Sequence, residues 1–363
     1  MTTNEMKPVK VLVDSFADEG LTNAQMINAR EIVSRLNPDR FYVSMFVREV
    51  AAPQILARPN THLIRIPSRL QTIPLLARFL FGGQDILFYL KASPASRWYL
   101  KMRSLQSSHC AIIGSIESQT DWRDETITPQ AKRMIEETVL RCDYLFSNSA
   151  KVKRSLETNY GLQSEIVPTG VDTGFFTPNW ERPANLRPRV LFVGALRIFK
   201  GPQVVLDAAR RYPEADFVLV GDGVMRQELQ DRARALSNVE LRGTLGRSEI
   251  REEYRRADIF MFPSRWEGSP RVLMEAAASG LPVLARKDYQ PESVIDGTTG
   301  FLASEDDEMM LSLGQLLADC DLRRRLGECG RSHISRFSWD LITRQWEMIF
   351  LRLAARQRKG SQT

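Results

Sequence analysis

The chain has 363 residues, of which 43% are hydrophobic and 26% are charged, with 21 glycines and 18 prolines. This is the composition of a globular protein, and it excludes collagen, a coiled coil and a chain that is disordered throughout. The net charge of +6 is spread over both halves without a basic tail, so we expect no nucleic-acid partner. At about 100 to 200 residues per domain, the length predicts two domains.

Cysteines and histidines are too few and too scattered to predict a metal site. The four cysteines contain no Cys-x-x-Cys pair, and no two of the three histidines are four residues apart. These cysteines favour a reducing compartment. The first ten residues lack the apolar core of a signal peptide, and the longest apolar stretch, 73–81, is too short for a membrane span and contains Arg78. We therefore expect a cytoplasmic protein.

The first half of the chain alternates short apolar segments with longer amphipathic ones. A strand over 9–13 is followed by a loop with Gly20 and by a helix from about 24 to 36. Further strands are predicted at 42–46, 63–66, 86–89, 111–116 and 144–146. Strands that alternate with helices predict a parallel sheet with helical crossovers.

The same pattern begins again after a proline-rich segment at 178–188. A strand at 190–193 precedes a helix over about 202–212, and the last segment, 339–358, is predicted to be a long amphipathic helix. Further strands are predicted at 217–220, 239–241, 259–262 and 282–285. We therefore predict an α/β protein with two Rossmann-like, doubly wound domains, 1–180 and 181–339.

The segment 262–276, directly after a predicted strand, has the highest density of chemically informative residues. Ser269 is a natural N-cap, and Pro270 is a natural first residue of a helix. The free backbone amides of Arg271 and Val272 would then bind an anion, because a helix N-terminus favours negative charge. The alternative is that Ser-Pro is only a good helix start.

Two glutamates lie on either side of this helix start. Glu275 lies about four residues after the first-turn amides, which corresponds to a rise of roughly 6 to 8 Å along the helix. This is close to the span from a diphosphate to the ribose of the same nucleotide. Glu267 precedes the helix in the loop, where it would face the group that the diphosphate carries, such as a sugar. The alternative is that both glutamates are only solvated.

Loops after the neighbouring strands reach the same edge of the predicted sheet. The loop 194–201 begins with Gly194 and carries Arg197 and Lys200, two cations suited to a leaving diphosphate. The other candidates are two glycines that permit close backbone approach and two residues that would line a base pocket, namely Gly221, Gly223, Thr244 and Leu245.

These segments resemble the retaining nucleotide-sugar glycosyltransferases of family 4, which have the two-domain GT-B fold. The resemblance is strongest over about 166–302. It rests on the two glutamates with seven residues between them and on the segments 167–172, 194–201, 221–223, 291–293 and 300–302.

The resemblance implies transfer of a glycosyl group from a nucleoside-diphosphate sugar, with a UDP-sugar favoured, to an acceptor hydroxyl. It further implies net retention at the anomeric carbon and no need for a metal ion or other cofactor. Lys200 would stabilise the leaving diphosphate, Glu267 would hold the sugar hydroxyls and Glu275 the ribose. The phosphates would lie against Gly268, Ser269, Pro270, Arg271 and Val272.

For the N-terminal domain, the resemblance implies two further features. The C-terminal helix, 340–363, would return to this domain. Gly20 would approach the diphosphate from the same domain. The acceptor should bind there as well.

Three positions depart from the family's pattern. Ala195 stands where an arginine is common, Gly20 stands alone where glycines are often paired, and Glu117 stands where a histidine is common. Glu117 would orient the acceptor hydroxyl or the donor sugar, or it would only cap the strand that precedes it. These departures leave open a sugar-nucleotide-binding protein without transferase activity. The shared fold leaves open a second alternative, a sugar-nucleotide epimerase.

The region 58–103 is locally basic, with eight lysines and arginines against the single acid Asp85, and it is rich in aromatic residues. Such a surface would contact anionic lipid head groups, or it would be a solvated basic face over core aromatics. The first interpretation predicts a lipid-linked acceptor, a peripheral position on the inner face of a membrane, and a role in glycan, polysaccharide or glycolipid biosynthesis.

Overall fold

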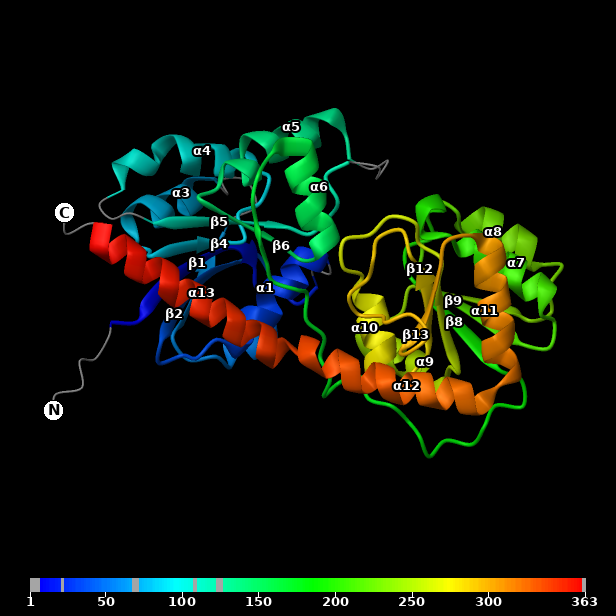
Figure 1. Cartoon of the computed structure of the whole chain (residues 1–363). Coiled ribbons are helices and arrows are strands. Elements are labelled where there is room, and N and C mark those ends of the chain that lie inside the picture. The colour runs from blue at the N-terminus through cyan, green and yellow to red at the C-terminus, as the bar shows by residue number, and fades with distance from the viewer. Residues whose placement is uncertain (1–6, 21–22, 67–71, 107–109, 122–126, 361–363) are drawn as a thin grey trace. The chain divides into compact units, whose positions relative to one another are not determined.

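The structure is a computed structural model that describes residues 7–20, 23–66, 72–106, 110–121 and 127–360. The chain forms two compact units, shown in Figure 1. The N-terminal unit comprises Met1–Thr169 with Trp339–Thr363, and the C-terminal unit comprises Gly170–Ser338.

The boundary between the units lies before 170 and not at 180 as predicted. The Val171 amide donates to the Phe337 carbonyl (2.9 Å), and Phe176 is buried in the core of the C-terminal unit. The Arg331 guanidinium donates to the Thr173 and Phe176 carbonyls at 2.7 and 2.8 Å. Because these hydrogen bonds and the burial of Phe176 tie the segment after 170 to the core of the C-terminal unit, it belongs to that unit.

In the described residues, the N-terminal unit contains a seven-stranded parallel sheet in the order β3-β2-β1-β4-β5-β6-β7. The order reverses between β1 and β4, and such a reversal is where doubly wound sheets bind ligands. The strands are β1 (Val9–Phe16), β2 (Phe41–Val47), β3 (Thr61–Arg65), β4 (Ile86–Phe88), β5 (Ala111–Ile116), β6 (Tyr144–Ser147) and β7 (Glu165–Ile166). The two-residue β7 is absent from the sequence prediction.

Helices cover both faces of this sheet. One core contains apolar residues of α1 and α13, and a second core lies on the opposite side of the strands. The helices are α1 (Ala24–Arg35), α2 (Pro53–Leu56), α3 (Thr72–Phe81), α4 (Pro94–Met102), α5 (Pro129–Glu137), α6 (Ala150–Tyr160) and α13 (Trp339–Gly360). Side chains of Asn23, Ser93, Thr128 and Ser149 cap four of these helices.

Aromatic packing attaches the C-terminal helix α13 to the N-terminal unit (Figure 1). Trp346 lies 4.7 Å from Phe88 and 4.9 Å from Phe146, measured between ring centroids. Phe350 lies 4.9 Å from Phe88 and 6.1 Å from Phe41. Since each buried aromatic ring stabilises a core by a few kcal/mol, these contacts explain why the end of the chain returns to the first unit.

The C-terminal unit contains, in the described residues, a six-stranded parallel sheet in the order β10-β9-β8-β11-β12-β13. Its order reverses between β8 and β11. The strands are β8 (Arg189–Val193), β9 (Asp216–Val220), β10 (Val239–Gly243), β11 (Ile259–Phe262), β12 (Val283–Arg286) and β13 (Gly300–Ala303). Strand β13 was not predicted from the sequence.

The helices of this unit are α7 (Pro202–Arg211), α8 (Arg226–Ala233), α9 (Arg247–Arg256), α10 (Arg271–Ala278), α11 (Asp306–Ala318) and α12 (Cys320–Ile334). The one-turn helix η3 (Ile198–Lys200) follows β8. In the part of the chain that the structure describes, no helix has the length and apolar character needed to span a membrane.

Candidate functional site

Two of the predicted loops lie on either side of the reversal point in the C-terminal sheet. The loop 194–201 follows β8, and the loop 263–270 follows β11. The Arg265 amide donates to the Phe199 carbonyl (2.9 Å), which joins the two loops directly. The residues that the sequence placed in these loops therefore meet at the carboxyl edge of the sheet, where ligands bind in doubly wound folds.

Lys200 and Glu267 form an ion pair across these two loops. The Lys200 Nζ lies 2.5 Å from the Glu267 Oε1, and the Ser264 hydroxyl donates to the same oxygen at 2.6 Å. Only 20% of the Lys200 side chain and 11% of the Glu267 side chain are exposed. Lys200 also lies 5.6 Å from the centre of the Phe262 ring. Because an ammonium group has three donor hydrogens, pairing with one carboxylate leaves capacity for an incoming phosphate.

Helix α10 begins at Arg271, so the prediction that Ser269 caps it and Pro270 starts it is wrong by one residue. Pro270 occupies the N-cap position with an extended backbone (φ −71°, ψ 115°), and within the described residues no side chain caps the helix. The helical dihedral angles thus begin only after the proline. The Arg271 and Val272 amides remain in the first turn, where helical amides have no carbonyl one turn earlier to bond. The predicted anion site keeps its backbone donors.

Glu275 is held by a tyrosine that the sequence analysis missed. The Tyr254 hydroxyl, at the end of α9, lies 3.2 Å from Glu275 Oε2 and 3.3 Å from the Val272 carbonyl. Burial raises the pKa of Glu275, while Arg271, the Tyr254 hydrogen bond and Arg247 oppose that rise. Burial and the Glu275 charge raise the pKa of Tyr254 well above its ordinary value, so this tyrosine is a hydrogen-bond donor at neutral pH. The available signal in the sequence was a single aromatic residue in a helix composed mostly of charged residues.

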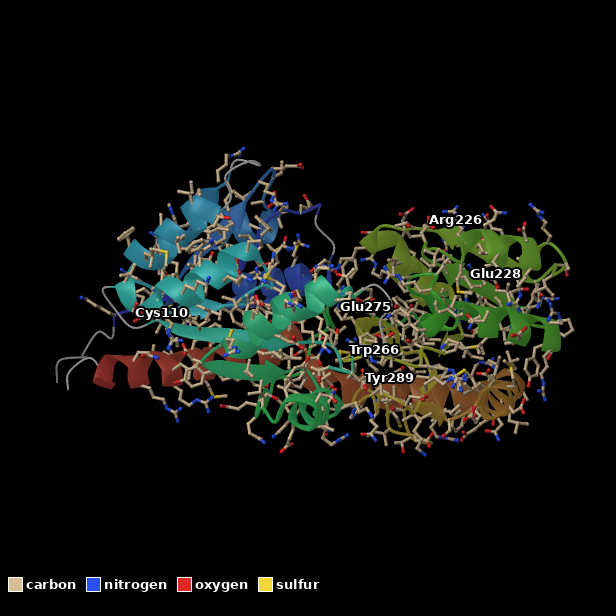
Figure 2. The ribbon with its side chains drawn as sticks, turned by 90° about the horizontal axis from the view of Figure 1, so that it is seen from above. Cys110, Arg226, Glu228, Trp266, Glu275 and Tyr289 are labelled. Atoms are coloured by element: carbon tan, nitrogen blue, oxygen red, sulfur yellow. The ribbon has the colours of Figure 1, made fainter. Side chains whose placement is uncertain are left out.

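A second missed tyrosine lies close to Glu267. Tyr289 follows β12, is fully buried, and has a hydroxyl without a hydrogen-bond partner among the described residues. Burial, and after it the negative charge of Glu267, raise the pKa of Tyr289. Figure 2 shows Trp266, Glu275 and Tyr289 on one side of the C-terminal unit, away from Arg226 and Glu228 of α8.

Gly221 and Gly223 are required by contacts inside the protein. A Cβ on Gly221, whose φ is +137°, would lie 1.9 Å from the Gly194 carbonyl oxygen. A Cβ on Gly223 would lie 2.5 Å from the Leu196 carbonyl oxygen, and the Leu196 amide donates to the Asp222 carbonyl at 2.9 Å. These glycines bring the loops after β8 and β9 together. Contact with a donor stays a prediction for them and for Gly194.

The remaining predicted residues of this unit lie around the same edge. Arg197 is half-buried and lies in the same loop as Lys200. Gly268 is buried between Glu267 and the start of α10. Thr244 is exposed and Leu245 half-buried after β10, at the far edge of the sheet from β11. Their role in binding the nucleotide base stays a prediction.

The other two candidates, Glu117 and Gly20, belong to the N-terminal unit. Glu117 follows β5, and its Oε1 accepts hydrogen bonds from the Tyr89 hydroxyl (2.7 Å) and from Asn28 Nδ2 (3.0 Å). Its backbone carbonyl accepts from Asn148 Nδ2 at 3.1 Å. Gly20 is exposed, and among the described atoms nothing lies within 4 Å of the point where a Cβ would stand. Glu117 is thus held by several polar contacts, whereas a side chain at position 20 would meet no described atom.

In the described parts of the chain, no group of three or more His, Cys, Asp or Glu residues is placed to hold a metal ion.

Comparison with known proteins identifies the C-terminal unit. Residues 187–319 match the family described as glycosyl transferases group 1. Over these residues the chain is similar to that family. The resemblance drawn from the sequence is thereby confirmed. The matched residues include Lys200, Glu267 and Glu275.

Curated relatives support the same assignment. The D-inositol 3-phosphate glycosyltransferase of Corynebacterium urealyticum is 28% identical over 294 residues, which cover 72% of this chain and 68% of the relative. The chain spans 56–61% of the length of the D-inositol 3-phosphate glycosyltransferases from four other Corynebacterium species.

Solved structures confirm the predicted fold class. Sucrose-phosphate synthase from Thermosynechococcus elongatus matches with a TM-score of 0.76 at 21% identity, covering 96% of this chain and all of that one. The Anabaena protein HepE, solved with UDP-glucose, matches with a TM-score of 0.74 at 17% identity, covering 94% of this chain and 99% of that one. At these identities the likeness shows the GT-B fold alone.

Proposed function

We propose that this glycosyltransferase homologue transfers a sugar from a nucleoside-diphosphate sugar, with a UDP-sugar favoured, to an acceptor hydroxyl, with retention at the anomeric carbon. The observation that carries the proposal is the Lys200–Glu267 pair beside the α10 N-terminus, at the reversal point of the sheet. The family match over these residues and the UDP-glucose complex of HepE support it.

Each group at this edge would have a distinct task. Lys200 and the Arg271 and Val272 amides would stabilise the negative charge that develops on the diphosphate as its bond to the sugar breaks. Glu267 would accept hydrogen bonds from the sugar hydroxyls. Glu275, oriented by Tyr254, would accept them from the ribose. Since an ammonium group and a helix N-terminus supply the positive charge, we propose that transfer needs no metal ion or other cofactor.

The residues of the region 58–103 bear on which kind of acceptor the protein uses. Arg58 is buried and donates to the Leu36 and Phe41 carbonyls, so it belongs to the interior. Phe79 and Tyr99 are fully buried as well. These three residues therefore fit the second interpretation of this region, in which aromatic residues of the core lie beneath a solvated basic face.

The outer side of the same region presents large apolar side chains. The exposed fraction is 65% for Ile73 and 81% for Phe81 on α3, and 49% for Trp98 on α4. Lys101 lies 5.7 Å from the Trp98 ring. Exposed apolar residues beside a cation suit a membrane surface with anionic lipids. We therefore propose that the acceptor is lipid-linked or lies at a membrane, as in glycolipid or polysaccharide biosynthesis.

A screen of the purified chain against nucleoside-diphosphate sugars would test the donor site. We expect one donor to raise the melting temperature and to be slowly hydrolysed, with both effects reduced in Lys200→Ala and Glu275→Ala. Stabilisation without turnover, even with added acceptors, would support a sugar-nucleotide-binding protein. Isomerisation of the sugar without an acceptor would support an epimerase. No stabilisation by any donor would contradict the proposed site.

A further inference from the structure

The N-terminal unit contains a small polar cavity at the carboxyl ends of β5 and β6. Its volume is about 20 Å³, which is room for about one water molecule or one hydroxyl group. The polar residues in its wall include Asn28, Tyr89, Ser115, Glu117 and Asn148, and Trp339 of α13 adds an apolar surface.

Three polar atoms in the cavity wall have no hydrogen-bond partner among the residues that the structure describes. These are Asn28 Oδ1, Ser115 Oγ and Asn148 Oδ1, and their residues are only 3%, 9% and 8% exposed. Buried polar atoms are nearly always paired in folded proteins. Three such atoms around one cavity therefore indicate a group that is bound there.

The hydrogen bonds already present show which kind of group fits. The Asn28 amide nitrogen donates to Glu117 Oε1, and the Asn148 amide nitrogen donates to the Glu117 carbonyl, so both amide oxygens are left as acceptors. Ser115 can donate or accept. Two amide acceptors in the wall favour a bound group that donates hydrogen bonds. The neighbouring carboxylate makes the cavity unfavourable for an anion.

The backbone at Tyr89 is an independent sign of function. This residue is 6% exposed and adopts φ +58°, a left-handed conformation that is strained for a bulky aromatic residue. Strain of this kind persists only where the surrounding contacts enforce it, and such residues cluster at functional sites. Here it accompanies the bond from the Tyr89 hydroxyl to Glu117 Oε1, which helps to hold the carboxylate in the cavity wall.

We propose that this cavity binds one hydroxyl arm of a neutral polyol or sugar. Asn28, Ser115 and Asn148 are its positioning residues, and Glu117 supplies the negative charge that excludes phosphate. The assignment of this ligand as the glycosyl acceptor rests on the proposed function. Binding of the hydroxyl arm itself does not rest on the proposed function, because all residues that line the cavity belong to the N-terminal unit.

Saturation-transfer NMR on the full-length chain would test binding, with myo-inositol and methyl glucoside as neutral probes, glycerol 3-phosphate as an anion and ethylammonium as a cation. We expect the neutral probes to bind and Ser115→Ala to weaken them about fivefold. Ser279→Ala is the matched control, because the Ser279 hydroxyl is also buried and without a hydrogen-bond partner among the described residues, but Ser279 belongs to the C-terminal unit and does not line the cavity. This control should bind the probes like the wild type.

Other outcomes would overturn the proposal. A change in melting temperature for Ser115→Ala with unchanged polyol binding would show a structural water only. Equal or tighter binding of glycerol 3-phosphate would contradict the exclusion of anions, and binding of ethylammonium alone would make this a cation site. The melting-temperature shift with UDP, measured on the same samples, reports separately on the donor site and on folding of each variant.

Discussion

The two units place different chemistry at the carboxyl edges of similar parallel sheets. In the C-terminal unit a lysine and a glutamate are already paired at 2.5 Å, next to a helix N-terminus. In the N-terminal unit, three buried polar atoms around a cavity lack partners in the described residues, next to a carboxylate. The first arrangement suits a charged diphosphate, and the second suits a neutral hydroxyl group. Similar sheets can thus position opposite electrostatic environments, because loop residues decide the chemistry.

The largest expected effect tests the charged side of this comparison. Lys200→Met should lower kcat for transfer or donor hydrolysis about 10²- to 10³-fold, because it removes a fixed positive charge from the leaving diphosphate. Release of UDP would measure this. Lys132→Met is the control, since it breaks a lysine–glutamate pair that is exposed and lies in the N-terminal unit. A loss of less than threefold for Lys200→Met would contradict the assigned role.

A second prediction tests how rigidly the loops of the C-terminal unit are packed. Gly221→Ala should lower the free energy of unfolding by about 3 kcal/mol, because its Cβ would meet the Gly194 carbonyl at a positive φ. Urea denaturation would measure the change. Gly297→Ala is a matched control with φ +70° and no described atom within 4 Å of the added Cβ, so it should show the cost of strain alone, about 1 kcal/mol. Equal losses in both variants would contradict the close-packing argument.

A third prediction concerns the pH dependence that Glu275 brings to the donor site. Because its pKa is raised on folding, the folded protein binds the proton more tightly, so this residue lowers the free energy of unfolding as the pH rises from 4.5 through the raised pKa. Glu275→Gln should remove that part of the pH dependence. It should also weaken UDP about tenfold at neutral pH, since a charged hydrogen bond to the ribose is lost. Denaturation and calorimetry between pH 4.5 and 7.5 would measure both effects.

The control for this third prediction is Glu292→Gln, which changes the same charge at another position of the C-terminal unit. It should leave UDP affinity unchanged. A Glu275→Gln protein that binds UDP like the wild type would contradict the ribose assignment.

The smallest expected effect concerns the outer surface of the N-terminal unit. Phe81→Glu should reduce partitioning onto phosphatidylglycerol vesicles a few-fold, because it replaces an exposed apolar side chain with a negative charge. Vesicle cosedimentation at two salt concentrations would measure it. Leu186→Glu is the control, because this leucine is even more exposed than Phe81 but lies in the C-terminal unit. Equal losses in both variants, or no binding by the wild type, would contradict a membrane contact through α3 and α4.

Much of the fold and the central residues of the proposed donor site follow from local patterns. Apolar runs followed by amphipathic segments predict the strands of both sheets, although β7 and β13 are too short or too weakly apolar to be recognised. Lys200, Glu267 and Glu275 were identifiable because they lie in loops or at a helix start directly after apolar strands. The start of α10 was misplaced by one residue, because the dihedral angles of Pro270 depend on the loop before it.

The sequence by itself determined the alternation of strands and helices and the groups that suit a diphosphate, because these depend on residues close together in the chain. Only the tertiary structure decided that Tyr254 holds Glu275, that Tyr289 lies near Glu267, and that residues from α1, β5 and the β6–α6 turn enclose one cavity. It also decided that the segment after 170 belongs to the C-terminal unit. These features join residues up to about 160 positions apart, and packing alone brings such residues together.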